Sequence, residues 1–250
     1  MHPANLLVLS ILISRAPTET SVGIPSGRLS LTPALGALMG VPYVEDGVRD
    51  GRGRWTTFTH PDIQRPSPGF NCSGLVIEAS RCLLGFAGGI EDATRDRRGD
   101  SGAQAPLGRD WDFAWDLVLN LSEGKARQVM LPDCELAVSH QADGQSLRGF
   151  ALDEQAHWQR ILPRLHNDRV YLGSISRERR IRRGHAWTPT VEHYHAVLFL
   201  KDTGGRTWLY QTLPHGRSHR LEISSPQGFS RMVRMFGPRK RLLLLEVDPY

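Results

Sequence analysis

One cysteine lies at a position where its thiol could act as a nucleophile. Cys72 lies in the segment NCSGLV, residues 71–76, at the point where a polar, Gly- and Pro-rich loop gives way to a periodic apolar segment. A cysteine acts as a nucleophile through its thiolate, and a helix N-terminus or a neighbouring imidazolium lowers the thiol pKa. The small residues Ser73 and Gly74 would let a substrate carbonyl approach the sulfur closely. On position alone, Cys72 fits a catalytic thiol and a small buried hydrophobe equally well.

The periodic segment after Cys72 predicts the helix that would position this thiol. Apolar residues recur along residues 71–84 at the spacing of one helix face. Gly85 is placed to end the helix, and Asn71 can cap its start. The residues of the apolar face are Leu75, Val76, Ala79, Cys82 and Leu83.

The remaining elements read as helices followed by strands. Short helices are expected over residues 31–39, with Thr32 as N-cap and Pro33 in the first turn, and over residues 154–162. Residues 111–121 are apolar enough to be buried but fit a helix and a strand equally, and residues 91–110 predict a charged, exposed loop. Helices first and an antiparallel sheet after them indicate an α+β fold. The expected strands cover residues 170–175, 194–200, 207–212 and 242–247.

An upstream element adds a family resemblance. The segment GVPY, residues 40–43, followed by NCSGLV, resembles the pattern G-x-P-Y and then D-C-S-G-L-V of the NlpC/P60 family of papain-like cysteine peptidases. The resemblance implies a papain-like fold with N-terminal helices packed on an antiparallel sheet. It implies Cys72 as nucleophile and Tyr43 as a substrate-binding or oxyanion-stabilising residue, with Ser73 beside them. Asn71 replaces the family's usual Asp, although Asn still caps a helix.

The same resemblance implies a catalytic base. The segment EHYHAVLFL, residues 192–200, is similar to the family's H-V-G-I-Y-L strand and implies that His195 is the catalytic histidine. Residues 165–171 (LHNDRVY) resemble the L-x-x-G-D-L-V-F element that precedes this strand, with Asn167 in place of Gly. The family's order of a cysteine on a helix and then a histidine on a strand is kept.

The following hairpin predicts a third residue. The turn DTGG, residues 202–205, lies between two alternating runs, so residues 194–212 indicate a β-hairpin. A register centred on that turn puts Gln211 or Thr212 opposite His195. The family's third residue is a His, Asn or Gln on this strand that orients the imidazole. Gln211 is therefore the predicted orienting residue, with His215 in reserve.

The other histidines and a basic run are weaker indications of a functional site. His193 and His195 would share one strand face, but an HxH pair with no carboxylate in a clear ligand position favours a surface or supporting role for His193 over a metal site. No cofactor is implied. The run from Arg177 to Arg183 (RERRIRR) is typical of a solvated segment, with contact to an anionic polymer as the functional alternative. Nucleic-acid binding is disfavoured because no aromatic residues are interleaved with this run.

Length and composition fit one large catalytic domain. The chain has 250 residues, a net charge of +5 and three cysteines, an odd number that leaves at least one thiol outside any intrachain disulfide. Residues 1–16 form a possible signal peptide, which would imply an extracytoplasmic location, although no Lys or Arg precedes their apolar run. Residues 17–31 are a predicted linker. The catalytic domain would cover residues 32–250, with an insertion over about 86–155, and no segment is long enough to span a membrane.

The expected activity follows from the resemblance. It implies a thiol protease or amidase that cleaves a peptide or isopeptide bond, such as the D-glutamate–diaminopimelate bond of stem peptides in bacterial cell-wall peptidoglycan. Two alternatives stay open. One is a papain-like acyltransferase, and the other is a catalytically silent papain-like domain that binds cell-wall material or a protein partner.

Overall fold

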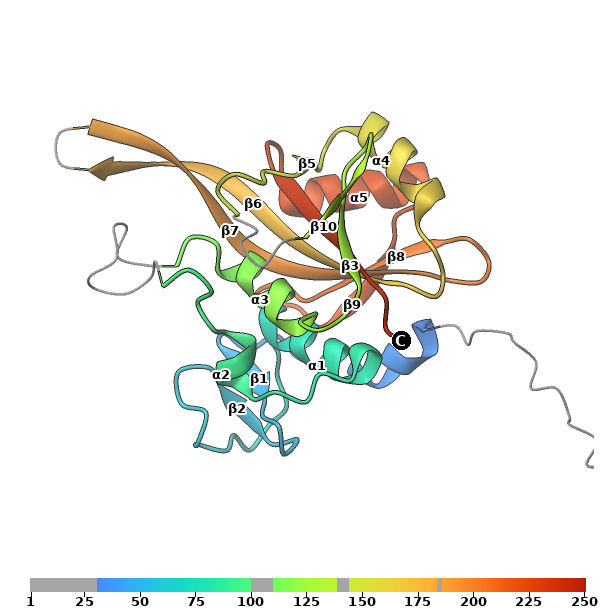
Figure 1. The fold of residues 1–250 in the computed structure, drawn as a ribbon. Helices are drawn as coiled ribbons and strands as arrows, with labels where there is room; N and C mark the ends of the chain where they lie inside the picture. The colour runs from blue at the N-terminus through green and yellow to red at the C-terminus, as the bar shows by residue number, and fades with distance from the viewer. Residues whose placement is uncertain (1–30, 100–109, 139–143, 184–185) are drawn as a thin grey trace, which may run out of the picture.

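A single antiparallel sheet organises the molecule. The computed structural model describes residues 31–99, 110–138, 144–183 and 186–250. Eight strands form the sheet in the order β4-β3-β10-β6-β7-β8-β9, with β5 also paired to β10 (Figure 1). Their bounds are β3 Arg127–Met130, β4 Glu135–Ala137, β5 Phe150–Ala151, β6 Val170–Arg183, β7 Ala186–Lys201, β8 Thr207–Gln211, β9 His219–Glu222 and β10 Arg241–Val247.

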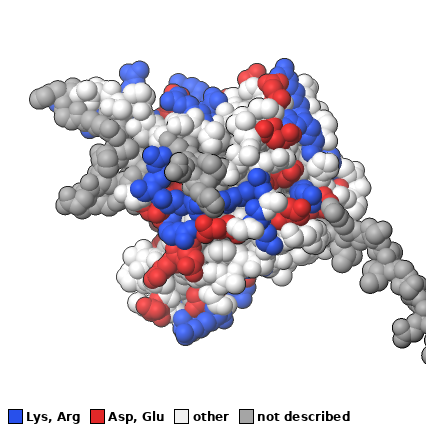
Figure 2. Space-filling model, viewed as in Figure 1, with Lys and Arg blue, Asp and Glu red and all other residues white. Residues whose placement is uncertain are grey.

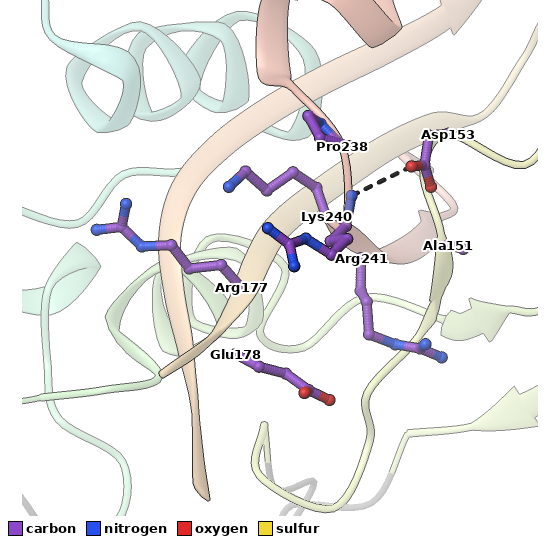
Figure 3. Close-up of a pocket in the computed structure, with 8 residues that line it drawn as sticks. Ala151, Asp153, Arg177, Glu178, Pro238, Lys240 and Arg241 are labelled. Carbon is purple, nitrogen blue, oxygen red and sulfur yellow. Dashed lines mark hydrogen bonds between the residues drawn. The ribbon is translucent and has the colours of Figure 1, made fainter. Parts of the chain in front are cut away.

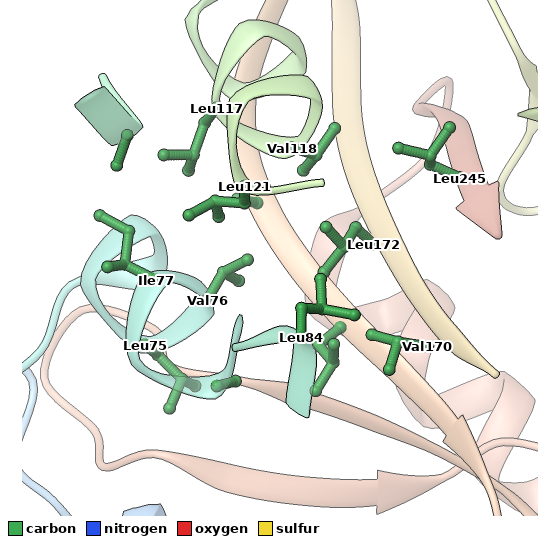
Figure 4. Packing of buried hydrophobic residues seen from close by; sticks show 14 of the residues in the cluster. Leu75, Val76, Ile77, Leu84, Leu117, Val118, Leu121, Val170, Leu172 and Leu245 are labelled. Carbon is green, nitrogen blue, oxygen red and sulfur yellow. The ribbon is translucent and has the colours of Figure 1, made fainter. Parts of the chain in front are cut away.

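Helices cover both faces of this sheet because its central strands are apolar on both sides. Successive residues of a strand point to opposite faces, and along β10 Leu243 and Leu245 join one core cluster while Leu242 and Leu244 join the other. The first cluster packs against η1 (Thr32–Leu38), α1 (Cys72–Leu84) and α3 (Phe113–Leu121), as Figure 4 shows for α1 and α3. The second packs against α4 (Gln155–Ile161) and α5 (Pro226–Phe236). The shorter η2 (Leu162–Arg164) and α2 (Ile90–Ala93) complete the described helices.

A two-stranded sheet fixes the start of α1. It consists of β1 (Gly47–Arg49) and β2 (Trp55–Thr57). The Asn71 N–H donates to the Gly47 carbonyl over 2.9 Å. A Cβ on Gly74 would lie only 2.2 Å from the same carbonyl oxygen, so only glycine allows this approach. The first turn of α1 is thereby held against β1.

The mixed fold with an antiparallel sheet is confirmed, and so are its main elements. All four predicted strands are present as parts of β6, β7, β8 and β10. The helix after Cys72 ends at Leu84, with Gly85 in the left-handed conformation at φ 67°. The predicted helix over residues 154–162 is α4, and the undecided residues 111–121 contain α3.

The structure corrects one expectation, adds detail to a second and leaves two others outside the described residues. The helix after residue 31 is a 3-10 helix whose N-cap is Leu31, and no side chain caps it, so Thr32 is not its N-cap. The segment 86–155 contributes α3 to the core and β3 to the sheet. The possible signal peptide and almost all of the predicted linker lie outside the described residues.

The basic run, predicted to be a solvated loop or strand edge, forms part of a strand, and its residues 178–180 and 182 are exposed. Arg177 to Arg183 form the second half of β6, which continues with β7 as a hairpin beyond the rest of the sheet (Figure 1). Among the described residues, no helix is long and apolar enough to cross a membrane.

Candidate active site

The N-terminus of α1 places Cys72 at a cluster of backbone donors. Asn71 adopts an extended conformation and its Oδ1 accepts a hydrogen bond from the Gly74 N–H at 2.8 Å, so Asn71 is the N-cap and Cys72 the first helical residue. Cys72 is partly exposed. Ser73 is buried, and its Oγ lies 3.9 Å from the Cys72 Sγ. The predicted position of the thiol at a helix start is confirmed.

The GVPY element lies directly beside this helix start. Tyr43 and Phe70 form a parallel β-bridge, in which the Phe70 N–H donates to the Pro42 carbonyl over 3.0 Å. Burial raises the pKa of the Tyr43 phenol, and the nearby charges of Cys72 and Glu45 raise it further. Tyr43 therefore stands close enough to Cys72 for the two groups to interact.

A β-bulge sets the direction of the histidine opposite Cys72. Ile175 pairs with His195 and Ser176 with His193, so Tyr194 is an extra residue on β7 without a partner on β6. A bulge of this kind re-aims the side chains on the bulged strand. The pairing of β7 with β8 begins only at Leu198, so the described part of β8 leaves the edge of β7 beside His195 unpaired.

The Cys72 thiol occupies this unpaired edge. Burial by itself would raise the pKa of Cys72. The charge of His195 and a hydrogen bond from its imidazole oppose that effect, together with hydrogen bonds from the Ala196 backbone N–H and Ser73, and lower the pKa to about 7. A thiol with this pKa is substantially ionised at neutral pH, as a cysteine nucleophile requires.

His195 is enclosed on its other side. It is only 7 % exposed, and its ring lies 5.4 Å from the Phe236 ring of α5. Its Nε2 is buried and has no hydrogen-bond partner among the described residues. One polar atom of the imidazole is therefore available for an orienting group.

Gln211 does not contact this atom in the described residues. Leu198 pairs with Tyr210, so continuing the register places Gln211 across from Val197, two residues beyond His195. The predicted register, with Gln211 or Thr212 directly opposite His195, is wrong because the turn holds one residue more than its DTGG signal. The Gln211 Nε2 contacts His219 at 3.2 Å and the sulfur of Met235, while its buried Oε1 has no partner among the described residues.

The two other histidines considered from the sequence have different surroundings. His215 lies in the exposed turn before β9 at φ 63°. His193 is 2 % exposed, and its ring contacts the Ser174 hydroxyl and the Gly144 carbonyl, both at 2.8 Å. Of the two roles predicted for His193, its burial excludes the surface position and leaves the supporting one. The predicted sharing of one strand face with His195 is interrupted by the bulge at Tyr194. The described residues contain no group of His, Cys, Asp and Glu that could hold a metal ion.

Sequence reasoning missed two contributors to the site. The Ala196 N–H donates to the thiol, and Tyr194 lies between His195 and a pair of cations. The ring centroids of Tyr194 and His195 are 6.2 Å apart. The bulge that exposes both groups depends on long-range strand pairing, and the only local signal was the extra aromatic residue between the two histidines.

Comparisons with known proteins add no family assignment to this geometry. No protein-family model, no curated protein and no solved structure matches the chain.

Proposed function

We propose that the chain is a papain-like cysteine hydrolase of the NlpC/P60 type, with Cys72 as nucleophile and His195 as base. The observation that supports this most directly is the Cys72 thiol, whose pKa of about 7 results from the neighbouring imidazole against the opposing effect of burial. Structural cysteines in apolar surroundings have raised pKa values instead. The sequence resemblance supports the same pair of residues.

In the proposed reaction, the Cys72 thiolate attacks an acyl carbonyl carbon and a carbon–sulfur bond forms. The N–H groups at the start of α1, with the Tyr43 hydroxyl, stabilise the negative charge that develops on the carbonyl oxygen. The His195 imidazolium gives its proton to the leaving amine as the carbon–nitrogen bond breaks. His195 then takes a proton from the water that attacks the thioester. The carbon–sulfur bond breaks, which releases the acid and restores the Cys72 thiolate beside the His195 imidazolium.

Gln211 completes the proposal as a positioning residue. Its unpartnered Oε1 and the unpartnered Nε2 of His195 are both buried near the end of α5, since Met235 contacts Gln211 and Phe236 contacts His195. A change in the Gln211 side-chain torsions would let the amide oxygen accept a hydrogen bond from His195. That bond would fix the imidazole orientation that the thiolate requires.

The first test is the pH dependence of Cys72 alkylation by iodoacetamide, followed residue by residue with mass spectrometry. Cys82 serves as an internal control, because it is exposed and its pKa is raised by burial and by Glu78. The rate at Cys72 is expected to rise with a midpoint near pH 7, well below that of Cys82. A midpoint for Cys72 at or above its ordinary value of 9.0 would overturn the proposed activation.

The second test concerns the substrate. We propose the peptide or isopeptide bonds of bacterial cell-wall stem peptides, including the bond between D-glutamate and diaminopimelate, on the basis of the resemblance alone. Purified muropeptides incubated with the protein are expected to yield new amino termini, and a Cys72→Ala variant is expected to yield none. An activated thiol without hydrolysis, but with acyl transfer to an added amine or alcohol, would assign an acyltransferase. Binding of muropeptides without labelling or turnover would assign the silent binding domain.

A further inference from the structure

A polar cavity lies next to Tyr194, the residue that precedes His195 in the chain. It has a volume of about 610 Å³ and lies where β5, β6 and the start of β10 meet (Figure 3). Four cationic residues line it, namely Arg177, Arg239, Lys240 and Arg241. Figure 3 shows the side chains of Arg177 and Lys240 extending in the same direction from these strands.

The carboxylates of the cavity are already engaged. Glu178 forms an ion pair with Arg148 at 3.2 Å, and Asp153 accepts a hydrogen bond from the Arg239 backbone N–H at 3.1 Å. Neither carboxylate pairs with the Lys240 ammonium or the Arg239 guanidinium among the described contacts. Acidic and basic side chains are interspersed over the face in Figure 2. In the cavity, Arg239 and Lys240 have no ion pair among the described contacts.

Two of the cations are anchored and thus pre-positioned. The Arg241 guanidinium donates to the Arg148 and Gly149 carbonyls, over 2.9 Å and 2.5 Å. Arg177 pairs with Glu192 at 2.5 Å. Side chains that are held before a ligand arrives lose less conformational freedom on binding than mobile ones do.

Tyr194 connects this cavity to the proposed catalytic pair. The Arg177 guanidinium carbon lies 4.6 Å from the centre of the Tyr194 ring and the Lys240 Nζ lies 5.7 Å from it. The Tyr194 ring in turn lies beside His195. A ligand whose reacting carbonyl sat at Cys72 would therefore extend past Tyr194 to reach the cations.

Lys240 lies among other cations. Burial lowers its pKa, and repulsion from Arg177, Arg179 and Arg239 lowers it further, while the charge of Glu192 opposes this in part. An anion placed among these groups would relieve the repulsion, and a charge-assisted hydrogen bond to each cation would add to its binding.

We propose that this cavity is an anion subsite, which binds a carboxylate or phosphate group carried by the substrate while the scissile carbonyl lies at Cys72. The assignment to the substrate rests on the proposed hydrolase function, whereas the binding of an anion in the cavity does not. Acyl substrates with such a group would be preferred over neutral ones of the same length.

The first experiment tests whether the cavity binds an anion, and it does not require catalysis. Inorganic phosphate and glutarate are titrated at low ionic strength into the full chain carrying Cys72→Ser, and binding is followed by calorimetry. A double variant, Arg239→Gln with Lys240→Gln, is expected to weaken binding of the preferred anion by about tenfold or more, as expected when charge-assisted contacts are removed. Arg52→Gln is the matched control for lost charge, since Arg52 is exposed between β1 and β2, and should leave binding unchanged.

The two probes distinguish a phosphate from a carboxylate ligand. Tighter binding of phosphate assigns a phosphorylated group, and tighter binding of glutarate assigns a carboxylate. No binding of either anion, or equal weakening by Arg52→Gln, would overturn the subsite even if Cys72 proved to be catalytic.

The substrate part is tested by the charge preference of Cys72 itself. Iodoacetate and iodoacetamide are similar in size, but only iodoacetate carries a negative charge. The rate of Cys72 alkylation by iodoacetate, divided by the rate with iodoacetamide, is expected to fall about tenfold in the double variant. The iodoacetamide rate itself should stay constant. An unchanged ratio, together with phosphate or glutarate binding, would separate the cavity from the substrate path. Failure of both reagents to label Cys72 would count against the hydrolase, while anion binding would still be decided by calorimetry.

Discussion

Two histidines on one strand, separated by a single residue, have opposite environments. His193 lies in the region where β7 faces α3, and both of its ring nitrogens are engaged by Ser174 and by the Gly144 carbonyl. His195 lies in the region where β7 faces the start of α1, beside the Cys72 thiol, and its Nε2 has no partner among the described residues. A fully bonded ring stabilises a fold, whereas a ring with an open nitrogen and a thiol neighbour can exchange protons.

The difference arises from the backbone between them. In a regular strand, residues two apart share a face, so two histidines at this spacing should have similar surroundings. The extra residue Tyr194 breaks that rule, and the late start of the β7–β8 pairing opens the strand edge on which Cys72 sits. Neighbouring residues of one type can therefore take a structural and a chemical role.

Removal of the His195 imidazole tests the comparison most strongly. At pH 7 about half of the Cys72 would be thiolate. In His195→Gln the burial that raises the pKa remains while the charge and hydrogen bond of the imidazole are lost, so the pKa should rise well above 7 even though the Ala196 N–H and Ser73 still lower it. The alkylation rate of Cys72 at pH 7 is expected to fall by about tenfold or more. Urea unfolding should show the variant as stable as the parent, and a reactive Cys72 in this variant would refute the pairing.

The equivalent change at His193 should affect stability and not chemistry. His193→Ala leaves the Ser174 hydroxyl and the Gly144 carbonyl without this partner and opens a cavity. The free energy of unfolding is expected to fall by about 2 kcal/mol. Denaturant titration measures this loss, and iodoacetamide labelling of Cys72 in the still-folded fraction should change less than about twofold. A large loss of Cys72 reactivity with intact stability would show that both histidines serve the thiol.

A smaller effect is expected when Gln211, the proposed positioning residue, is replaced. Gln211→Leu keeps the bulk of the side chain but removes the amide that would bond the open nitrogen of His195. Turnover on muropeptides should fall about tenfold, as expected for one orienting hydrogen bond of about 1.4 kcal/mol, with little change in KM. Gln211→Asn should restore part of kcat. An unaffected kcat in Gln211→Leu would remove Gln211 from the proposal.

The smallest effect concerns the helix cap next to the nucleophile. Asn71→Ala removes the hydrogen bond to the Gly74 N–H and should cost about 1 kcal/mol of unfolding free energy. Asn71→Asp should keep the cap, but its negative charge beside Cys72 should raise the midpoint of the labelling profile. Thermal unfolding and pH-resolved alkylation separate the two consequences, and an unchanged midpoint in Asn71→Asp would show that residue 71 has no influence on the thiol.

Local signals in the sequence were sufficient for the helix that carries Cys72. Its asparagine cap and its terminal glycine are read within residues 71–85, and both are present in the structure. Four residues of its predicted apolar face, Leu75, Val76, Ala79 and Leu83, are buried, whereas the fifth, Cys82, is exposed. The strands around His195 were also predicted, because their runs of Val, Leu and Phe are long. These features depend on residues close together in the chain.

The features that could not be predicted depend on pairing between strands that are far apart in the sequence. The bulge at Tyr194 is visible only when β7 is aligned with β6, and the hairpin register around Gln211 depends on a turn longer by one residue than its DTGG signal. The segment thought to be an insertion enters the sheet through β3 because its partner is β10, which lies far along the chain. The cavity lined by Lys240 and other cations could not be predicted, because these residues are brought together only by the pairing of strands that are distant in the sequence.

The place of β10 in the sheet has a consequence for how the molecule is made. This strand follows all the others in the sequence, yet it lies between β3 and β6 near the middle of the sheet. During synthesis, β3 is made well before its partner β10 and stays unpaired on that edge until β10 has been made. Such distant pairing slows folding and leaves apolar edges open to aggregation. A nascent chain that has not yet reached β10 should therefore depend on chaperones, because the middle of its sheet is incomplete.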